Sequence, residues 1–228
     1  MDFMNLLKSI EALLYELVSW LVFYPLTLWR CIREPLRMMA YARSELADLP
    51  DEQFIDALSP PIFLFLTIVI AHLLDLGFGA SHVAAGGVFA DTRNLLMFRA
   101  VAFSLLPLLL AVQAVRQQGL VLNRATLRPA FYSHCFIAAP FVLAIDLAMT
   151  VGIRDGTTAR MLGASIFLAG LAWYLAALTQ WFVVYRGTSR HRAFARALLF
   201  VLLGAVALMA ALILAALSIM VSDGRGLQ

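Results

Sequence analysis

The chain has 228 residues, of which 63% are hydrophobic and 14% charged, and its formal net charge is +3. Soluble domains carry about 25% charged residues. This composition, with a mean hydropathy of +0.88, therefore excludes an ordinary water-soluble domain. We expect an all-helical polytopic membrane protein, because a backbone inside lipid must satisfy its own hydrogen bonds. The basic residues are scattered over loops and form no stripe that would follow a nucleic acid.

The first predicted element is a helix within residues 1–59, a cytoplasmic or interfacial segment. Its apolar residues recur every three or four positions, and polar residues occupy the opposite face. This pattern predicts an amphipathic helix that lies in the membrane interface. A crossing by residues 12–29 is the alternative, since a single Glu within a span costs only about 3 kcal/mol. The apolar residues are Leu6, Leu7, Ile10, Leu13, Leu14, Leu17, Val18 and Leu21.

Two contrasting stretches follow this helix. The stretch "FYPLTLWRCIREP" combines aromatic residues with arginines and predicts an anchor at the cytoplasmic headgroups. The stretch "SELADLPDEQFIDALSPP" is acidic. It is either a solvated surface helix or a docking surface for a basic cytoplasmic partner.

Five later segments are long and apolar enough to span a bilayer, which takes roughly 20 helical residues. They are residues 60–78, 95–115, 130–151, 161–185 and 193–221. Only short polar connectors separate them. Residues 60–222 are therefore expected to form a five-helix transmembrane domain, and residues 223–228 a short external tail.

The basic residues predict the orientation, because Lys and Arg near span ends stay on the cytoplasmic side. With a cytoplasmic N-terminus, twelve of the 17 lie on that side and five on the other, which makes the C-terminus periplasmic. Only one of the 17 is Lys, and Ala and Leu are abundant. This bias indicates a GC-rich bacterial genome and hence a bacterial inner membrane.

Four ionisable residues within the spans form a candidate cluster, namely His72, Asp75, Arg99 and Asp146. At about 1.5 Å per residue, the two acids and Arg99 lie at a similar depth. His72 shares the face of Asp75 because residues three apart are neighbours. An isolated charge there costs about 3 kcal/mol, so we expect Arg99 to lie between the two acids. The cluster is either an interhelical lock or a transport or proton-linked site.

Two further features concern helix shape and packing. Pro107 and Pro140 lie near the centres of the second and third spans and predict kinks. In the fifth span, small residues predict close packing against another helix, from this chain or from another subunit. These small residues are Gly204, Ala207, Ala211 and Ala215.

Motifs for catalysis are largely missing from the sequence. It has no H-E-x-x-H pair, no G-x-S-x-G turn, no Walker loop and no G-x-G-x-x-G fingerprint. We therefore expect no enzymatic activity, no metal and no cofactor. Cys31 and Cys135 both fall on the cytoplasmic side, so we expect reduced thiols that serve in packing.

A family resemblance is carried by "FYPLTLWRCIREP", by the five-span count and by "RATLRPAFYSHCFIAAPFVLAIDLAM". These features resemble the Yip family, the Ypt-interacting membrane proteins and their bacterial relatives. The resemblance implies a Pro-containing amphipathic lead before five helices. It also implies that Tyr132 and Pro140 are the aromatic residue and the mid-helix proline of the third helix. Bacterial members are often labelled permeases without a defined substrate.

Two classes of function follow from these patterns. The first is a non-enzymatic interaction or assembly component of a membrane complex, as a homo- or hetero-oligomer within the lipid bilayer. The acidic segment and the small-residue face support this class. The second is a Yip-like permease for a small solute or lipid, which the buried charges and the kinked helices support.

Overall fold

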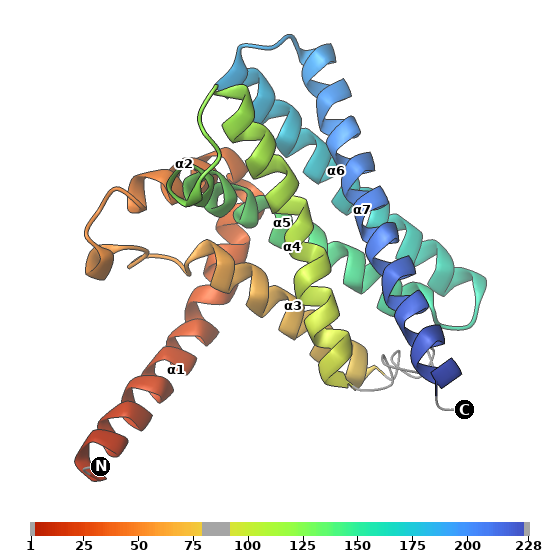
Figure 1. Cartoon of the computed structure of the whole chain (residues 1–228), viewed down its shortest axis with the longest axis horizontal. Helices are drawn as coiled ribbons and strands as arrows, with labels where there is room; N and C mark the ends of the chain where they lie inside the picture. Colours follow the sequence, from red (N-terminus) through yellow and green to blue (C-terminus); the bar gives the residue numbers. More distant parts are fainter. Residues whose placement is uncertain (1–2, 79–91, 226–228) are drawn as a thin grey trace.

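The computed structural model describes residues 3–78 and 92–225. Within these residues the chain forms seven α-helices and one short 3-10 helix (Figure 1). The α-helices are α1 (Phe3–Arg33), α2 (Pro35–Glu45), α3 (Pro60–Gly77), α4 (Thr92–Gln117), α5 (Arg124–Gly152), α6 (Thr157–Arg186) and α7 (Arg190–Arg225). The 3-10 helix is η1 (Pro50–Glu52).

Six of the described helices are long and apolar enough to cross a membrane, so the chain is a multi-pass helical membrane protein. Five of them, α3 to α7, correspond to the predicted spans. The sixth is α1, in which Leu7–Arg33 meets the same criteria of length and composition. The predicted count of five is therefore not confirmed. Helix α7 continues to Arg225, beyond the predicted domain end at residue 222, and residues 226–228 lie outside the described residues.

Local sequence accounts for the ends of several helices. Pro60 and Pro61 begin α3, at positions where a backbone N–H has no helical partner in any case. Asn123 caps α5, because its side chain accepts a hydrogen bond from the Thr126 N–H at 2.9 Å. The Thr126 hydroxyl accepts from the Asn123 N–H at 3.1 Å, which completes a capping box. Helix α6 ends at Gly187, which adopts the left-handed conformation with φ of 57°.

Helix α5 is the central helix of the bundle. Helices α3 to α7 run in alternating directions (Figure 1), and α5 contacts α1, α2, α3, α4 and α6. A helix that is apolar on all sides is typical of a core position. The middle of α5 fits this description and supplies much of the core, through Cys135, Phe136, Ile137, Ala138, Ala139, Phe141 and Val142.

Small residues let α5 and α6 approach closely. A Cβ atom at Gly163 would lie 2.6 Å from the Ala148 carbonyl oxygen and 2.7 Å from Gly152 Cα. A Cβ atom at Gly170 would lie 2.5 Å from Ala144 Cβ. Such backbone proximity is typical of membrane helix pairs, because lipid supplies no hydrophobic force to hold helices together. This contact was not predicted from the sequence.

The predicted packing face of α7 meets α4 of the same chain. A Cβ atom at Gly204 would lie 2.5 Å from Leu106 Cδ2, so the glycine leaves room for that leucine. Ala207 and Ala211 are half-buried. The side chain of Ala215 lies outside the part of the chain that the structure describes. At Gly204 the packing partner is therefore internal.

Both prolines that predict kinks lie inside continuous helices, Pro107 in α4 and Pro140 in α5. Pro140 is buried in the core, and Pro25 occupies an interior position in α1. Each proline removes one backbone hydrogen bond from its helix. The kinks themselves stay a prediction.

Helix α1 leaves the bundle, and its N-terminal half lies apart from the other helices (Figure 1). Its C-terminal half is held by side-chain contacts. The Tyr24 hydroxyl donates to Thr67 Oγ1 of α3 at 3.2 Å. The Trp173 indole of α6 donates to the Ile32 carbonyl at 3.0 Å. Among the described residues, these contacts therefore hold α1 at its C-terminal half.

Helix α2 packs on α5, where the Ser133 hydroxyl donates to the Met39 carbonyl at 3.0 Å. After η1, Phe54 adopts a left-handed conformation with φ of 59°, which is uncommon for a residue other than glycine. The Glu45 carboxylate accepts the Phe54 N–H and holds this turn. One acid of the predicted acidic segment thus has a structural role.

Candidate functional site

The four residues of the predicted charge cluster come together where α3, α4 and α5 meet. His72 and Asp75 lie one turn apart toward the end of α3. Arg99 lies near the start of α4, and Asp146 lies near the end of α5. Helices α3 and α5 run in one direction and α4 in the other (Figure 1), which brings the three helices together at these positions.

Arg99 lies between the two carboxylates. Its Nη2 forms an ion pair with Asp75 Oδ2 and lies 3.1 Å from Asp146 Oδ1. Its Nη1 lies 3.3 Å from His72 Nδ1. Because a guanidinium group only donates, Nδ1 is the acceptor in this contact. One guanidinium therefore joins three side chains from two other helices.

Thr150 completes the cluster and was not predicted from the sequence. Its hydroxyl donates to Asp75 Oδ1 and also lies 2.9 Å from the backbone carbonyl of Asp146. A hydroxyl has one proton, so it serves these two acceptors in turn. The signal in the sequence is its spacing, since a Thr four residues after a buried Asp shares that face of the helix.

The two acids and the histidine of the cluster are buried. Asp146, His72 and Asp75 are only 1%, 3% and 7% exposed. A buried charge without a partner is strongly destabilising, so these carboxylates depend on Arg99. Among the described residues, none donates an aligned hydrogen bond to the Asp146 carboxylate. Its contact with Arg99 is therefore electrostatic more than directional.

This arrangement allows two kinds of role, one structural and one chemical. It ties three helices together, and buried carboxylates within a membrane can also take up protons or contact a solute. Within residues 3–78 and 92–225, no group of three or more His, Cys, Asp or Glu side chains is arranged to hold a metal ion. The contacts of Arg99 with Asp75 and Asp146 are those of an ion-pair cluster.

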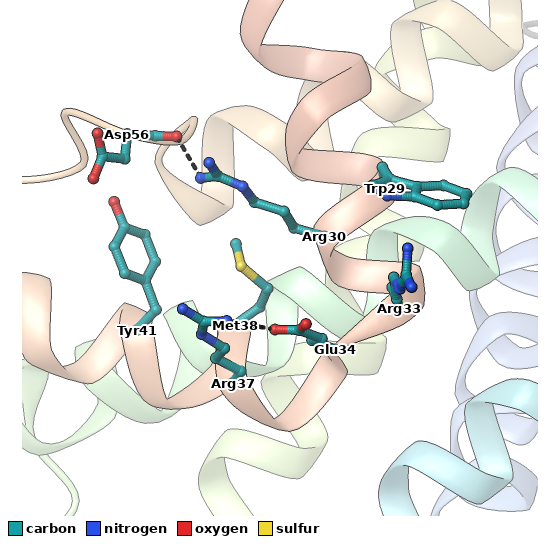
Figure 2. Close-up of a pocket in the computed structure, with 8 residues that line it drawn as sticks. All are labelled: Trp29, Arg30, Arg33, Glu34, Arg37, Met38, Tyr41 and Asp56. Atoms are coloured by element: carbon teal, nitrogen blue, oxygen red, sulfur yellow. Dashed lines mark hydrogen bonds and ion pairs between the residues drawn. The ribbon is translucent and has the colours of Figure 1, made fainter.

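A second site lies where α1 gives way to α2. It is a pocket of about 470 Å³ between the end of α1, the start of α2 and the segment before α3 (Figure 2). The sequence predicts an aromatic and arginine-rich anchor in this region but no pocket. The lining residues are Trp29, Arg30, Arg33, Glu34, Arg37, Met38, Tyr41 and Asp56.

The arginines of this pocket have different partners. Arg30 Nη1 donates to the Asp56 backbone carbonyl at 2.8 Å. Arg37 Nη1 forms an ion pair with Glu34 Oε2 at 2.9 Å. The Arg33 guanidinium carbon lies 5.8 Å from the centre of the Trp29 ring, a cation–π contact.

Tyr41 forms part of the wall of this pocket. Burial, together with the nearby carboxylates of Glu45 and Asp56, raises the pKa of Tyr41 to about 12. The phenol therefore stays neutral at physiological pH and adds no negative charge to the pocket.

Comparison of this chain with family models, with curated proteins and with solved structures gives no match.

Proposed function

We propose that the protein is a non-enzymatic component of a membrane complex, in which α1 binds another membrane protein. The observation that carries this proposal is the position of α1, whose N-terminal half lies apart from the bundle (Figure 1). Apolar side chains in this half and just beyond it are largely exposed, with values of 45% for Leu7, 56% for Leu14 and 76% for Leu21. An apolar helix face of this kind is a common recognition element for a partner helix or groove.

In this proposal the first part of α1 lies in the interface, and α3 to α7 cross the bilayer. The polar residues support this placement, since Lys8 and Glu16 lie on the face opposite to the leucines. Each charge would cost about 3 kcal/mol at the centre of a span, whereas water and headgroups solvate it at the interface. The N-terminal half of α1 is therefore placed beside the bilayer core, where it can meet a partner.

The proposal also includes the location and the family. The distribution of basic residues supports a bacterial inner membrane with a cytoplasmic N-terminus. Tyr132 and Pro140 support membership of the Yip family through their positions in α5. Either point can fail without affecting the role proposed for α1.

The charge cluster supports a structural role for the bundle. Arg99 pairs with Asp75 and Asp146 and thereby ties α4 to α3 and α5. A frame held in this way keeps α3, from which Thr67 contacts Tyr24 of α1, in a fixed place. The bundle then acts as a rigid base for α1.

Photo-crosslinking in native membranes tests the proposal. A photoreactive amino acid is placed at Leu14 or at Leu21, two turns apart on one face of α1. The control position is Val206 on α7, which is 64% exposed. We expect the same protein adduct from both α1 positions and none from position 206, with loss of the adduct when Leu17 is changed to Asp. Only lipid adducts at positions 14 and 21 would contradict the proposal.

The alternative function is a permease for a small solute or lipid. The specific observation in its favour is Asp146, a buried carboxylate that receives no aligned hydrogen bond from the described residues. Its test is solute uptake into proteoliposomes by the wild type, the Asp146→Asn variant and the Asp155→Asn variant, which changes an exposed acid. Uptake that is lost only in Asp146→Asn would replace the assembly proposal with this one.

A further inference from the structure

The pocket between α1 and α2 concentrates positive charge on a membrane-bound helix. Arg30, Arg33 and Arg37 follow one another at helical spacing across the junction, and all three are exposed. Two carboxylates, Glu34 and Asp56, also line the pocket (Figure 2). The pocket is thus lined by three guanidinium groups and two carboxylates, which leaves an excess of positive charge.

These arginines keep donors for a further acceptor. A guanidinium group has five N–H donors in a planar fork. The contacts described for Arg30 and Arg37 each use only the Nη1 atom. The cation–π contact of Arg33 with Trp29 places no oxygen acceptor on its N–H groups. This is the donor pattern that binds phosphate oxygens in pairs.

The same residues place the pocket at the level of the lipid headgroups. Exposed guanidinium groups are strongly disfavoured in hydrocarbon, whereas Trp side chains are enriched at the interface. Trp29 is 58% exposed beside Arg33. Along the same part of α1, Leu26 and Ile32 are 38% and 43% exposed, so apolar surface adjoins the charged pocket.

We propose that this pocket binds the phosphate of an anionic phospholipid, with the acyl chains along the exposed apolar surface of α1. A free phosphate would use the arginines, but it would leave Trp29, Leu26 and Ile32 without a role. Basic residues close to a membrane helix attract anionic lipids in addition to any specific contact. The proposal is independent of the partner proposed for α1, since the pocket lies at the opposite end of that helix.

Native mass spectrometry of the full chain in detergent tests this site. The protein is titrated with phosphatidylglycerol and, separately, with phosphatidylcholine. The test variant carries Arg30→Gln, Arg33→Gln and Arg37→Gln together. The control variant carries Arg124→Gln, Arg190→Gln and Arg192→Gln, three exposed arginines whose loss changes the net charge equally.

We expect the wild type and the control variant to retain phosphatidylglycerol in preference to phosphatidylcholine. The test variant should lose this preference, with binding about fivefold weaker for each arginine removed. A single Arg33→Lys variant keeps the charge but loses the planar fork, and it should bind phosphatidylglycerol more weakly than the wild type. This variant keeps the proposal testable if the triple variant does not fold.

Four results would overturn the proposal. One is equal retention of the two lipids by the wild type. Another is an equal loss in the control variant, which would show a general effect of charge. The third is displacement of phosphatidylglycerol by inorganic phosphate beyond the effect of chloride at the same ionic strength, which would assign the pocket to a soluble anion. The fourth is an acidic protein that co-purifies with the wild type and the control variant but not with the test variant, while the lipid preference of the test variant is unchanged.

Discussion

Arg99 connects α4 to α3 and α5 through its ion pairs. Its guanidinium contacts Asp75 on α3 and Asp146 on α5, and it also lies beside His72. Removal of the one cation would leave two buried carboxylates facing each other in a medium of low dielectric. A broken buried ion pair costs more than the intact pair contributes, because the remaining charge stays desolvated.

The Arg99→Gln variant should therefore be strongly destabilised, by about 3 to 5 kcal/mol. The control is Arg116→Gln, which changes an exposed arginine at the other end of the same helix. Thermal unfolding in detergent, followed by tryptophan fluorescence, should show a lower Tm for the first variant and little change for the second. Equal Tm values for both variants would mean that the cluster does not hold the helices together.

Thr150 offers a finer test of the same cluster. Thr150→Val removes the hydroxyl that donates to Asp75 and should cost about 1 to 3 kcal/mol, since it leaves a buried acceptor with one bond fewer. Thr179→Val is the matched control, because the buried Thr179 hydroxyl has no hydrogen-bond partner among the described residues. That control should be neutral or stabilising. The idea fails if chemical denaturation ranks the two variants in the reverse order.

The sequence predicts the charged members of this cluster but not its hydroxyl. Asp75, Arg99 and Asp146 can be placed by depth because charges are rare in spans and must find partners. A Thr in a membrane helix is common and bonds its own backbone one turn back, as Thr150 does with Asp146. Its second contact depends on how α3 and α5 pack, which no pattern within one helix contains.

At the scale of elements, the α5–α6 pair shows the same limit. Hydropathy is sufficient to predict both helices, and α3, α4 and α7 as well. The close approach at Gly163 depends on Ala148 and Gly152 in another helix, and that pairing has no periodic signal of its own. The break between α1 and α2, in contrast, is local, because Pro35 disfavours a helical conformation at Glu34.

The Gly163→Ala variant should force α5 and α6 apart. The added Cβ atom would meet the backbone of Ala148 and Gly152, which cannot move as a flexible side chain can. We expect a loss of about 1 to 3 kcal/mol, typical of an overpacked site. Gly77→Ala is the control, since a Cβ atom there meets nothing within 4 Å. Calorimetry in detergent should show a lower Tm for Gly163→Ala only. A decrease of the same size in Gly77→Ala would count against the close contact.

For the whole molecule, the number of crossings depends on α1. Length and composition allow Leu7–Arg33 to span a membrane, while the charged face of residues 3–19 favours the interface. The distribution of basic residues barely distinguishes an α1 that crosses the membrane from an α1 that lies in the interface. If α1 crosses, only Lys8 changes sides, so the count moves from 12 against 5 to 11 against 6. The positive-inside rule predicts the orientation of α3 to α7 and leaves that of the N-terminus open.

Cysteine accessibility in intact cells distinguishes the two topologies. Cys31 and Cys135 are fully buried and can be replaced by Ala to give a background for labelling. Single cysteines are then placed at Ser9 on α1, at Gln118 between α4 and α5, and at Asp155 between α5 and α6, all of which are exposed.

An impermeant maleimide should label Asp155→Cys in intact cells, because that loop lies on the periplasmic side in the proposed orientation. Gln118→Cys should react only after the membrane is opened. If α1 lies in the cytoplasmic interface, Ser9→Cys behaves as Gln118→Cys does, because its helix never leaves that side. If α1 crosses, Ser9→Cys reacts in intact cells together with Asp155→Cys. That result would add a sixth span and move the N-terminus to the periplasm, and the apolar face of α1 would then meet a partner within the hydrocarbon core.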